Sequence, residues 1–130
     1  KIVGQMEALV RGNERPDIIR YEELNNLFHE TTALIAGHGR LKKAQQSLNN
    51  QIKRMAYRSL ADRGHLERSC RFHREILNAI KTKDKPRAEA LTREHILKGM
   101  AAQEKVSKDH LRDDSNSTGY KEAAHAVTRG

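Results

Sequence analysis

Four side chains of types that bind metal ions stand out because their spacing turns them to the inward faces of predicted helices. They are Asn25, His29, His73 and His95. Asn25 and His29 stand four residues apart, so they share one helix face a single turn apart. His73 and His95 each lie on a stripe of small or apolar residues with spacings of three and four, which marks the buried side of a helix. The two stripes are Leu66, Cys70, His73, Leu77 and Ile80, and Ala88, Leu91, His95, Gly99 and Ala102.

Three imidazoles and an amide in one interior are suited to binding a divalent metal ion. Neutral imidazole is the commonest protein ligand for Zn²⁺, Ni²⁺ and similar ions. Three nitrogens and a weak oxygen ligand leave coordination positions open, as in a catalytic or ligand-binding site. A single histidine on an apolar stripe is more often a hydrogen-bonded core residue, so three structural histidines remain the alternative. Spacing alone leaves both interpretations open.

The composition favours a single all-α domain. The chain has 130 residues, enough for one hydrophobic core, and it contains only two prolines and 4% aromatic residues. Alanine, leucine, lysine, arginine and glutamate are frequent, which favours helices over a sheet. We predict an antiparallel bundle of about five to six helices.

The charge balance raises the alternative of a nucleic-acid-binding bundle. The 25 basic and 17 acidic residues give a net charge of +8. No run of basic residues is interleaved with aromatic residues, and the densest basic cluster falls in a predicted turn. Solvated outer helix faces are therefore the preferred interpretation of these charges.

The cysteine and hydropathy patterns point to the cytoplasm. A single cysteine, Cys70, excludes an internal disulfide and is typical of a reducing compartment. Its place on an apolar stripe predicts a small core residue. No segment has the apolar length of a membrane span, and no signal-peptide pattern opens the chain, so we expect a cytoplasmic protein without membrane contact.

Glycines, prolines and capping residues predict the helix boundaries. The first helix should end at Gly12, the second should begin around Pro16, and Asp84 should cap the last. The expected helices cover residues 2–11, 16–36, 41–64, 66–82 and 84–108, with the inward face of the third at Leu41, Ala44, Leu48, Ile52, Met55 and Ser59. Short connections favour antiparallel neighbours. We expect residues 1–108 to form the metal-binding and effector-binding domain and residues 109–130 to form a polar, mobile tail.

Two segments carry a resemblance to a known family. Residues 28–41 (FHETTALIAGHGRL) and 72–96 (FHREILNAIKTKDKPRAEALTREHI) resemble the FCD domain, the C-terminal effector-binding domain of GntR-type bacterial transcription regulators. The likeness runs from about Met6 to Met100. In that family an Asp and three His bind a divalent metal in a helical bundle. The resemblance therefore implies a metal site in this chain at the four positions named above.

The chain departs from the family pattern at two positions beside the implied site. Asn25 stands where the family has Asp, and Phe72 stands where a Glu commonly precedes the second histidine. A neutral amide is a weaker ligand than a carboxylate, so these departures bear on metal affinity and on the charge of the site.

The resemblance also implies a function and partners. The chain would be a ligand-sensing domain that binds Zn²⁺ or Ni²⁺ and a small organic acid, forms a homodimer, and modulates DNA binding. DNA would be contacted by an N-terminal winged helix-turn-helix domain, which we expect to be absent from this chain together with the first FCD helix.

Three further residues are candidates for the effector pocket. Thr32 lies one turn beyond His29 on the same face, although packing against a neighbouring helix is an equal alternative. Arg54 and Arg58 on the third helix could pair with an anion, because guanidinium matches a carboxylate bidentately, but arginines at helical spacing are usually surface residues. The remaining histidines are expected to be exposed: His38, His65, His110 and His125.

Two other functions stay open at this point. An open three-histidine site can activate water or support oxygen chemistry, so a metal-dependent hydrolase or oxygen-chemistry enzyme is one alternative. No glutamate clearly shares the inward faces of the ligand helices, which weighs against catalysis. A helical interaction module with structural histidines is the other alternative, and it would bind no metal.

Overall fold

The computed structural model describes the backbone of residues 1–12, 15–35, 53 and 55–127, with side chains in these ranges as far as Arg112. The described residues form α-helices joined by short turns and contain no strand, which confirms the all-α prediction. The helices are α1 (Ile2–Val10), α2 (Ile18–Ile35), α4 (Arg63–Lys81) and α5 (Lys85–Val127), and residues 55–60 are helical as well. The predicted positions Leu41, Ala44, Leu48 and Ile52 lie outside the described residues.

Local capping explains where α1 and α2 end and begin. The chain turns after α1 at Gly12, which takes a φ of +71°, in the left-handed region that glycine adopts without steric cost. Pro16 precedes α2 instead of lying within it, because Asp17 takes the capping role: its Oδ1 accepts the backbone N–H of Arg20 at 2.9 Å. The predicted start of this helix was therefore two residues early.

α4 begins three residues earlier than predicted. Asp62 is its N-cap, and the Asp62 Oδ1 accepts the backbone N–H of His65 at 2.6 Å. Gly64 therefore lies in the first turn of α4, whereas the sequence placed it at the end of the preceding helix. The consequence is that His65 is helical and buried.

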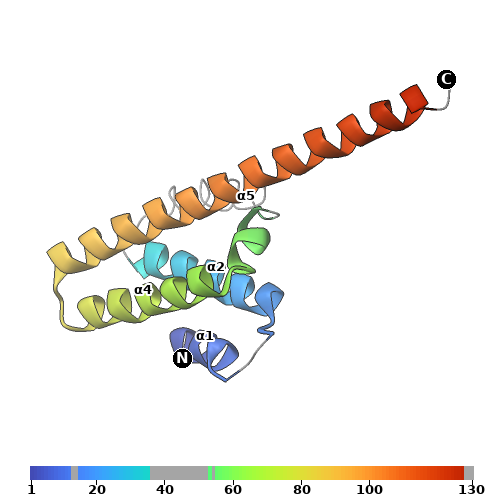
Figure 1. Cartoon of the computed structure of the whole chain (residues 1–130). Helices are drawn as coiled ribbons and strands as arrows, with labels where there is room; N and C mark the ends of the chain where they lie inside the picture. Colours follow the sequence, from blue (N-terminus) through green and yellow to red (C-terminus); the bar gives the residue numbers. More distant parts are fainter. Residues whose placement is uncertain (13–14, 36–52, 54, 128–130) are drawn as a thin grey trace.

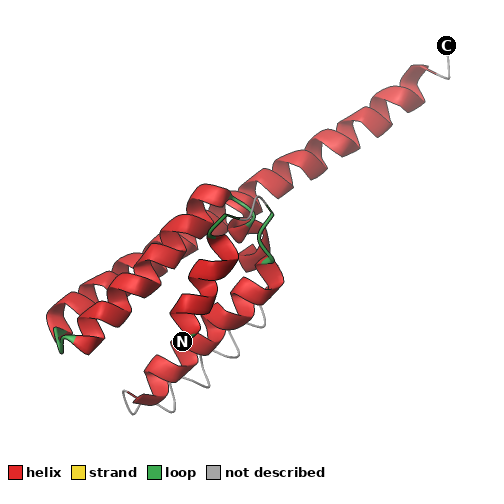
Figure 2. Ribbon diagram, turned by 90° about the horizontal axis from the view of Figure 1, so that it is seen from below, coloured by secondary structure: helices red, strands yellow, loops and turns green. Residues whose placement is uncertain are grey.

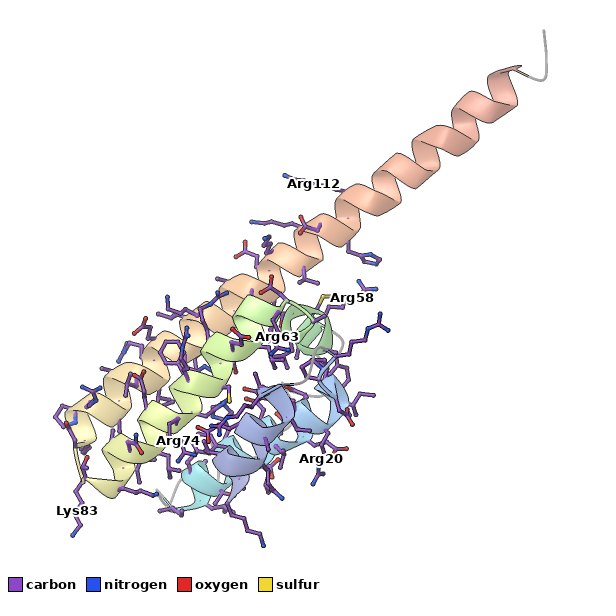
Figure 3. All side chains as sticks on the ribbon, turned by 60° about the horizontal axis from the view of Figure 1, so that its bottom comes forward. Arg20, Arg58, Arg63, Arg74, Lys83 and Arg112 are labelled. Carbon is purple, nitrogen blue, oxygen red and sulfur yellow. The ribbon has the colours of Figure 1, made fainter. Side chains whose placement is uncertain are left out.

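α4 and α5 form an antiparallel hairpin, as the short connection predicts (Figures 1 and 2). The turn between them contains Lys83, which has a φ of +57° (Figure 3). Asp84 caps α5 as predicted, since its Oδ1 accepts the backbone N–H of Arg87 at 3.1 Å, and Pro86 lies in the first turn.

α5 is longer than predicted. It continues to Val127, so the expected end near Lys108 was wrong, and its C-terminal part projects past the other described helices (Figure 1). Residues 113–120 (DDSNSTGY) have the composition of a turn but contain no proline. Extending an existing helix needs no new nucleus, and each of these residues costs at most about 1 kcal/mol relative to alanine. Nothing in the segment therefore forces the helix to stop.

Among the described residues, the hydrophobic core lies where α1, α2, α4 and the helical segment 55–60 meet. One cluster of buried residues comprises Met6, Val10, Tyr21, Leu24, Leu60, Leu66 and Cys70, and a second comprises Val3, Phe28 and Ile76. Cys70 is a buried core residue, as predicted. At the edge of the core, α1 is tied to α4 by Arg74, whose Nε and Nη2 donate to the two carboxylate oxygens of Glu7 at 2.7 and 2.6 Å (Figure 3). The core residues of α2 and α4 pack together, which fixes α2 beside α4. The antiparallel hairpin places α5 against α4, so that α2, α4 and α5 each bring one histidine into the same cluster.

Among the described helices, none combines the length and the apolar character that crossing a membrane requires.

Candidate metal centre

The fold brings three imidazoles from three helices into one cluster. His29 of α2, His73 of α4 and His95 of α5 each contribute one ring nitrogen, and these three atoms lie within 4.8 Å of one another. The ring centroids are 5.2 Å apart for His29 and His73, 5.3 Å for His29 and His95, and 4.6 Å for His73 and His95. The structure therefore brings together the three histidines that the sequence selected. Their role as metal ligands stays a prediction.

The nitrogens of two of the three rings have the separation that a shared ion requires. Nε2 of His73 lies 3.3 Å from Nε2 of His29. Two nitrogens that bind one Zn²⁺ at about 2.05 Å with a tetrahedral angle between them lie about 3.3 Å apart. An ion could therefore enter between these two rings with little movement of either side chain.

Tyr21 is a polar neighbour of the most deeply buried ring. His73 is fully buried, and its Nδ1 lies 3.5 Å from the hydroxyl oxygen of Tyr21. That hydroxyl donates to Oγ of Ser69 at 3.2 Å, so its lone pairs remain available to accept from the His73 Nδ1–H. A proton on Nδ1 leaves a lone pair on Nε2, which lies 3.3 Å from Nε2 of His29. Metal-binding histidines generally use such a partner to fix their tautomer.

Aromatic rings cover two sides of the cluster. Phe28 is buried and meets the rings of His29 and His73 edge to face, with centroid distances of 5.5 and 4.9 Å. Phe72 lies against His95 at 5.5 Å. These apolar contacts keep water from the imidazoles on the sides where they occur.

Burial keeps the three imidazoles neutral. Burial lowers the pKa of His29 to about 4 and that of His95 to about 3, and it lowers the pKa of His73 well below its usual value of 6.5. The neighbouring imidazoles lower the pKa of His73 and His95 further, because a second positive charge in the cluster would be repelled. At neutral pH protons therefore do not compete with a metal ion for these nitrogens.

This burial predicts that the metal-free domain loses stability in acid. Below about pH 6.5 the unfolded chain binds protons on the three histidines, while the folded chain does not, so falling pH favours unfolding. Glu22 opposes this effect between about pH 4.5 and 7, because burial raises its pKa from 4.5 to about 7. Because the three histidines outnumber this one carboxyl, the unfolded chain binds more protons than the folded chain. Each proton of this excess should lower the free energy of unfolding by about 1.4 kcal/mol for every pH unit of acidification.

The measurement is the urea midpoint of chelator-treated protein at pH 7.5 and pH 5.5. We expect the lower midpoint at pH 5.5 and a steeper loss in a Glu22→Gln variant, which lacks the opposing group. An equal or higher midpoint of the unmodified domain at pH 5.5 would contradict the neutral, buried state of the cluster.

Asn25 lies beside a buried carboxylate that the sequence analysis missed. Asn25 is half-buried, and its Nδ2 donates to Oε2 of Glu22 at 3.3 Å. Asn26 donates to the other carboxylate oxygen, Oε1, at 3.4 Å. Glu22 is only 5% exposed. Its spacing of three from Asn25 and seven from His29 was the available signal, because these spacings place all three residues on one helix face.

The effector candidates receive less support. The Thr32 hydroxyl donates to the backbone oxygens of Phe28 and His29 at 3.1 and 2.9 Å, so it is engaged within its own helix. Arg58 is half-buried on the helical segment 55–60 (Figure 3). Arg54 lies outside the described residues. An effector role for these three residues remains a prediction.

Two of the other histidines differ from the sequence expectation. His65 is buried, and it lies on the same face of α4 as Ser69 and His73, at spacings of four and eight residues. The expectation of an exposed side chain was wrong because it followed from the misplaced start of α4. His110 is half-buried on α5. His38 lies outside the described residues, and the side chain of His125 lies outside the range in which side chains are described.

Comparison with known protein families gives a match over most of the chain. The model of the FCD domain family matches residues 1–98, which include all three clustered histidines. No curated protein and no solved structure matches the chain. An FCD domain is a regulatory ligand-binding domain and not an enzyme, which removes the metalloenzyme alternative. The match covers about three quarters of the chain, and the chain therefore belongs to the FCD domain family, the C-terminal effector-binding domains of GntR-family regulators.

Proposed function

We propose that this domain senses a small carboxylate through a divalent metal ion, Zn²⁺ or Ni²⁺, held in the bundle interior. His29, His73 and His95 are the nitrogen ligands, and the Asn25 amide oxygen is a weaker fourth ligand. Effector binding then modulates the DNA binding of a GntR-type regulator. The observation that carries this proposal is the cluster of three imidazole nitrogens within 4.8 Å of one another on three helices.

The charge of the site favours an anionic effector. Among the described residues, the ligand cluster consists of imidazoles alone, and burial keeps them neutral. A divalent ion supplies a fixed positive charge and open coordination positions to this site when it is bound. Among the described residues, none of the three clustered side chains carries a charge that would offset that of the ion, so a small carboxylate is a better occupant than a neutral sugar or an amine.

The origin of the ligands supports a sensing role. α2, α4 and α5 each contribute one histidine, so the position of each helix affects the geometry of the site. An effector that binds one arrangement of these helices more tightly shifts the protein toward that arrangement, whereas equal affinities would switch nothing. In the intact regulator we propose that this shift passes across a homodimer to N-terminal winged helix-turn-helix domains in the cytoplasm.

The proposal is tested by elemental analysis of the purified domain together with native mass spectrometry. One divalent ion per chain, with the added mass of a small organic acid on part of the population, is the expected result. A folded domain that takes up neither from solutions containing both would contradict the proposal.

A further inference from the structure

Glu22 is a buried acidic side chain on α2, the helix that also carries His29. It is 5% exposed, and it accepts hydrogen bonds from the side-chain amides of Asn25 and Asn26, one on each carboxylate oxygen. The cluster of ligand atoms among the described residues does not include Glu22. Its hydrogen-bond partner Asn25 is the proposed fourth ligand.

The hydrogen bond to Glu22 involves one particular end of the Asn25 amide. Nδ2 of Asn25 donates to Oε2 of Glu22 at 3.3 Å, and above pH 7, where Glu22 is ionised, its carboxylate can only accept, so the amide presents its NH₂ group and not its oxygen. Glu22 lies three residues before Asn25 and His29 lies four residues after it, so both are neighbours of Asn25 on one face of α2. With the NH₂ group hydrogen-bonded to Glu22, the amide oxygen is the end of the Asn25 side chain that does not face Glu22.

This orientation matters because an amide has two unlike ends. The oxygen can bind a metal ion, while the NH₂ group has no lone pair to offer. A carboxylate at the same position would have two equivalent oxygens and would need no such control. An asparagine ligand therefore depends on a neighbour that an aspartate ligand does not need.

We propose that Glu22 is a positioning residue for the metal site: it holds the Asn25 amide so that Oδ1 is the atom presented to the ion. This inference rests on the proposed function, because it assumes that the three histidines bind a metal.

The test is a double-substitution cycle on the intact chain that measures Zn²⁺ affinity by competition with a chelator. Glu22→Met removes the acceptor at similar volume, and it should lower the affinity about tenfold or more, as the loss of a supporting partner does in other metal sites. In an Asn25→Asp background, Glu22→Met should lower the Zn²⁺ affinity less than about threefold. The Glu22→Gln variant keeps one acceptor oxygen. Its Zn²⁺ affinity should stay within about threefold of that of the unmodified protein.

A readout without metal accompanies the affinities. In the metal-free protein, the NMR signals of the Asn25 NH₂ group should show a downfield proton that is lost in Glu22→Met and retained in part in Glu22→Gln. The matched control is Asn26→Ala, which removes the other donor to Glu22 and should leave Zn²⁺ affinity within about threefold. If Glu22→Met does not fold, the test uses Glu22→Gln instead, by its Asn25 NH₂ signals and its Zn²⁺ affinity.

Several results would overturn the positioning role. The first is an unchanged Zn²⁺ affinity in Glu22→Met, and the second is an equal loss of affinity on Glu22→Met in the Asn25 and Asn25→Asp backgrounds. The third is a loss of affinity in Asn26→Ala as large as that in Glu22→Met. The fourth is an Asn25 NH₂ signal that does not change in Glu22→Met. An unmodified domain that binds Zn²⁺ but shows one of these results overturns this inference alone. An unmodified domain that binds no Zn²⁺ overturns the proposed function along with it.

Discussion

Replacing any one of His29, His73 or His95 with alanine should remove most of the bound metal. Each substitution deletes one of the three nitrogens that cluster within 4.8 Å, and the two that remain do not hold an ion as a three-nitrogen site does. A ligand present at 100 times its dissociation constant stabilises the folded state by about 2.7 kcal/mol. For a domain of this size, that corresponds to a loss on the order of 10 °C in Tm.

The informative quantity is the difference in Tm between metal-loaded and chelator-treated protein. This difference cancels the packing change that follows when a buried ring such as His73 is removed. His110→Ala is the matched control, because His110 lies about 22 Å along α5 from His95 and should leave the difference intact. Unchanged metal content in all three single variants would reject the site.

The amide ligand should contribute less than the imidazoles. Asn25→Ala should weaken metal binding less than any of the three histidine substitutions, and Asn25→Asp should strengthen it by supplying an anionic ligand. An Asn25→Ala loss as large as that of His73→Ala would contradict the assignment of Asn25 as the weak fourth ligand.

Small organic acids should raise the Tm of the metal-loaded domain. Lactate, pyruvate, malate and citrate carry carboxylates that can both coordinate the ion and offset its charge. An acid present at 100 times its dissociation constant should add about 2.7 kcal/mol of stability, again on the order of 10 °C. Neutral sugars and amines at the same concentration should give much smaller shifts.

The design that tests this dependence is a thermal-shift panel with and without chelator, on the unmodified protein and on His73→Ala. The metal-stripped domain and the variant should both respond weakly to the acids. Stabilisation by acids that survives complete removal of the metal would place the effector at another site and would reject the metal as its anchor.

The sequence was sufficient for the parts of the site that depend on periodicity. Apolar stripes with spacings of three and four residues predicted the inward faces of α4 and α5, and the structure puts His73 and His95 on those faces in one cluster with His29. Short turns with capping residues predicted the antiparallel hairpin, and Asp84 does cap α5. These features are local, so a single sequence contains the information they require.

The errors arose where the outcome depends on competing caps or on neighbouring helices. Asp62 was overlooked as the cap of α4, and the three residues it adds to that helix turned His65 from an expected exposed residue into a buried one. Glu22 was overlooked because a charged helical residue is usually solvated, and only the packing of neighbouring elements against α2 buries it. The length of α5 was underestimated because polar, turn-forming residues lower helix stability by small amounts that an existing helix tolerates.

The central claim is that one metal ion is shared by His29, His73 and His95. The most direct measurement is anomalous X-ray scattering at the zinc edge from crystals of the Zn²⁺-loaded domain. We expect one strong peak per chain, about 2.0–2.1 Å from a ring nitrogen of each of the three histidines. A peak bound by other side chains, or no peak between these rings at saturating Zn²⁺, would contradict it.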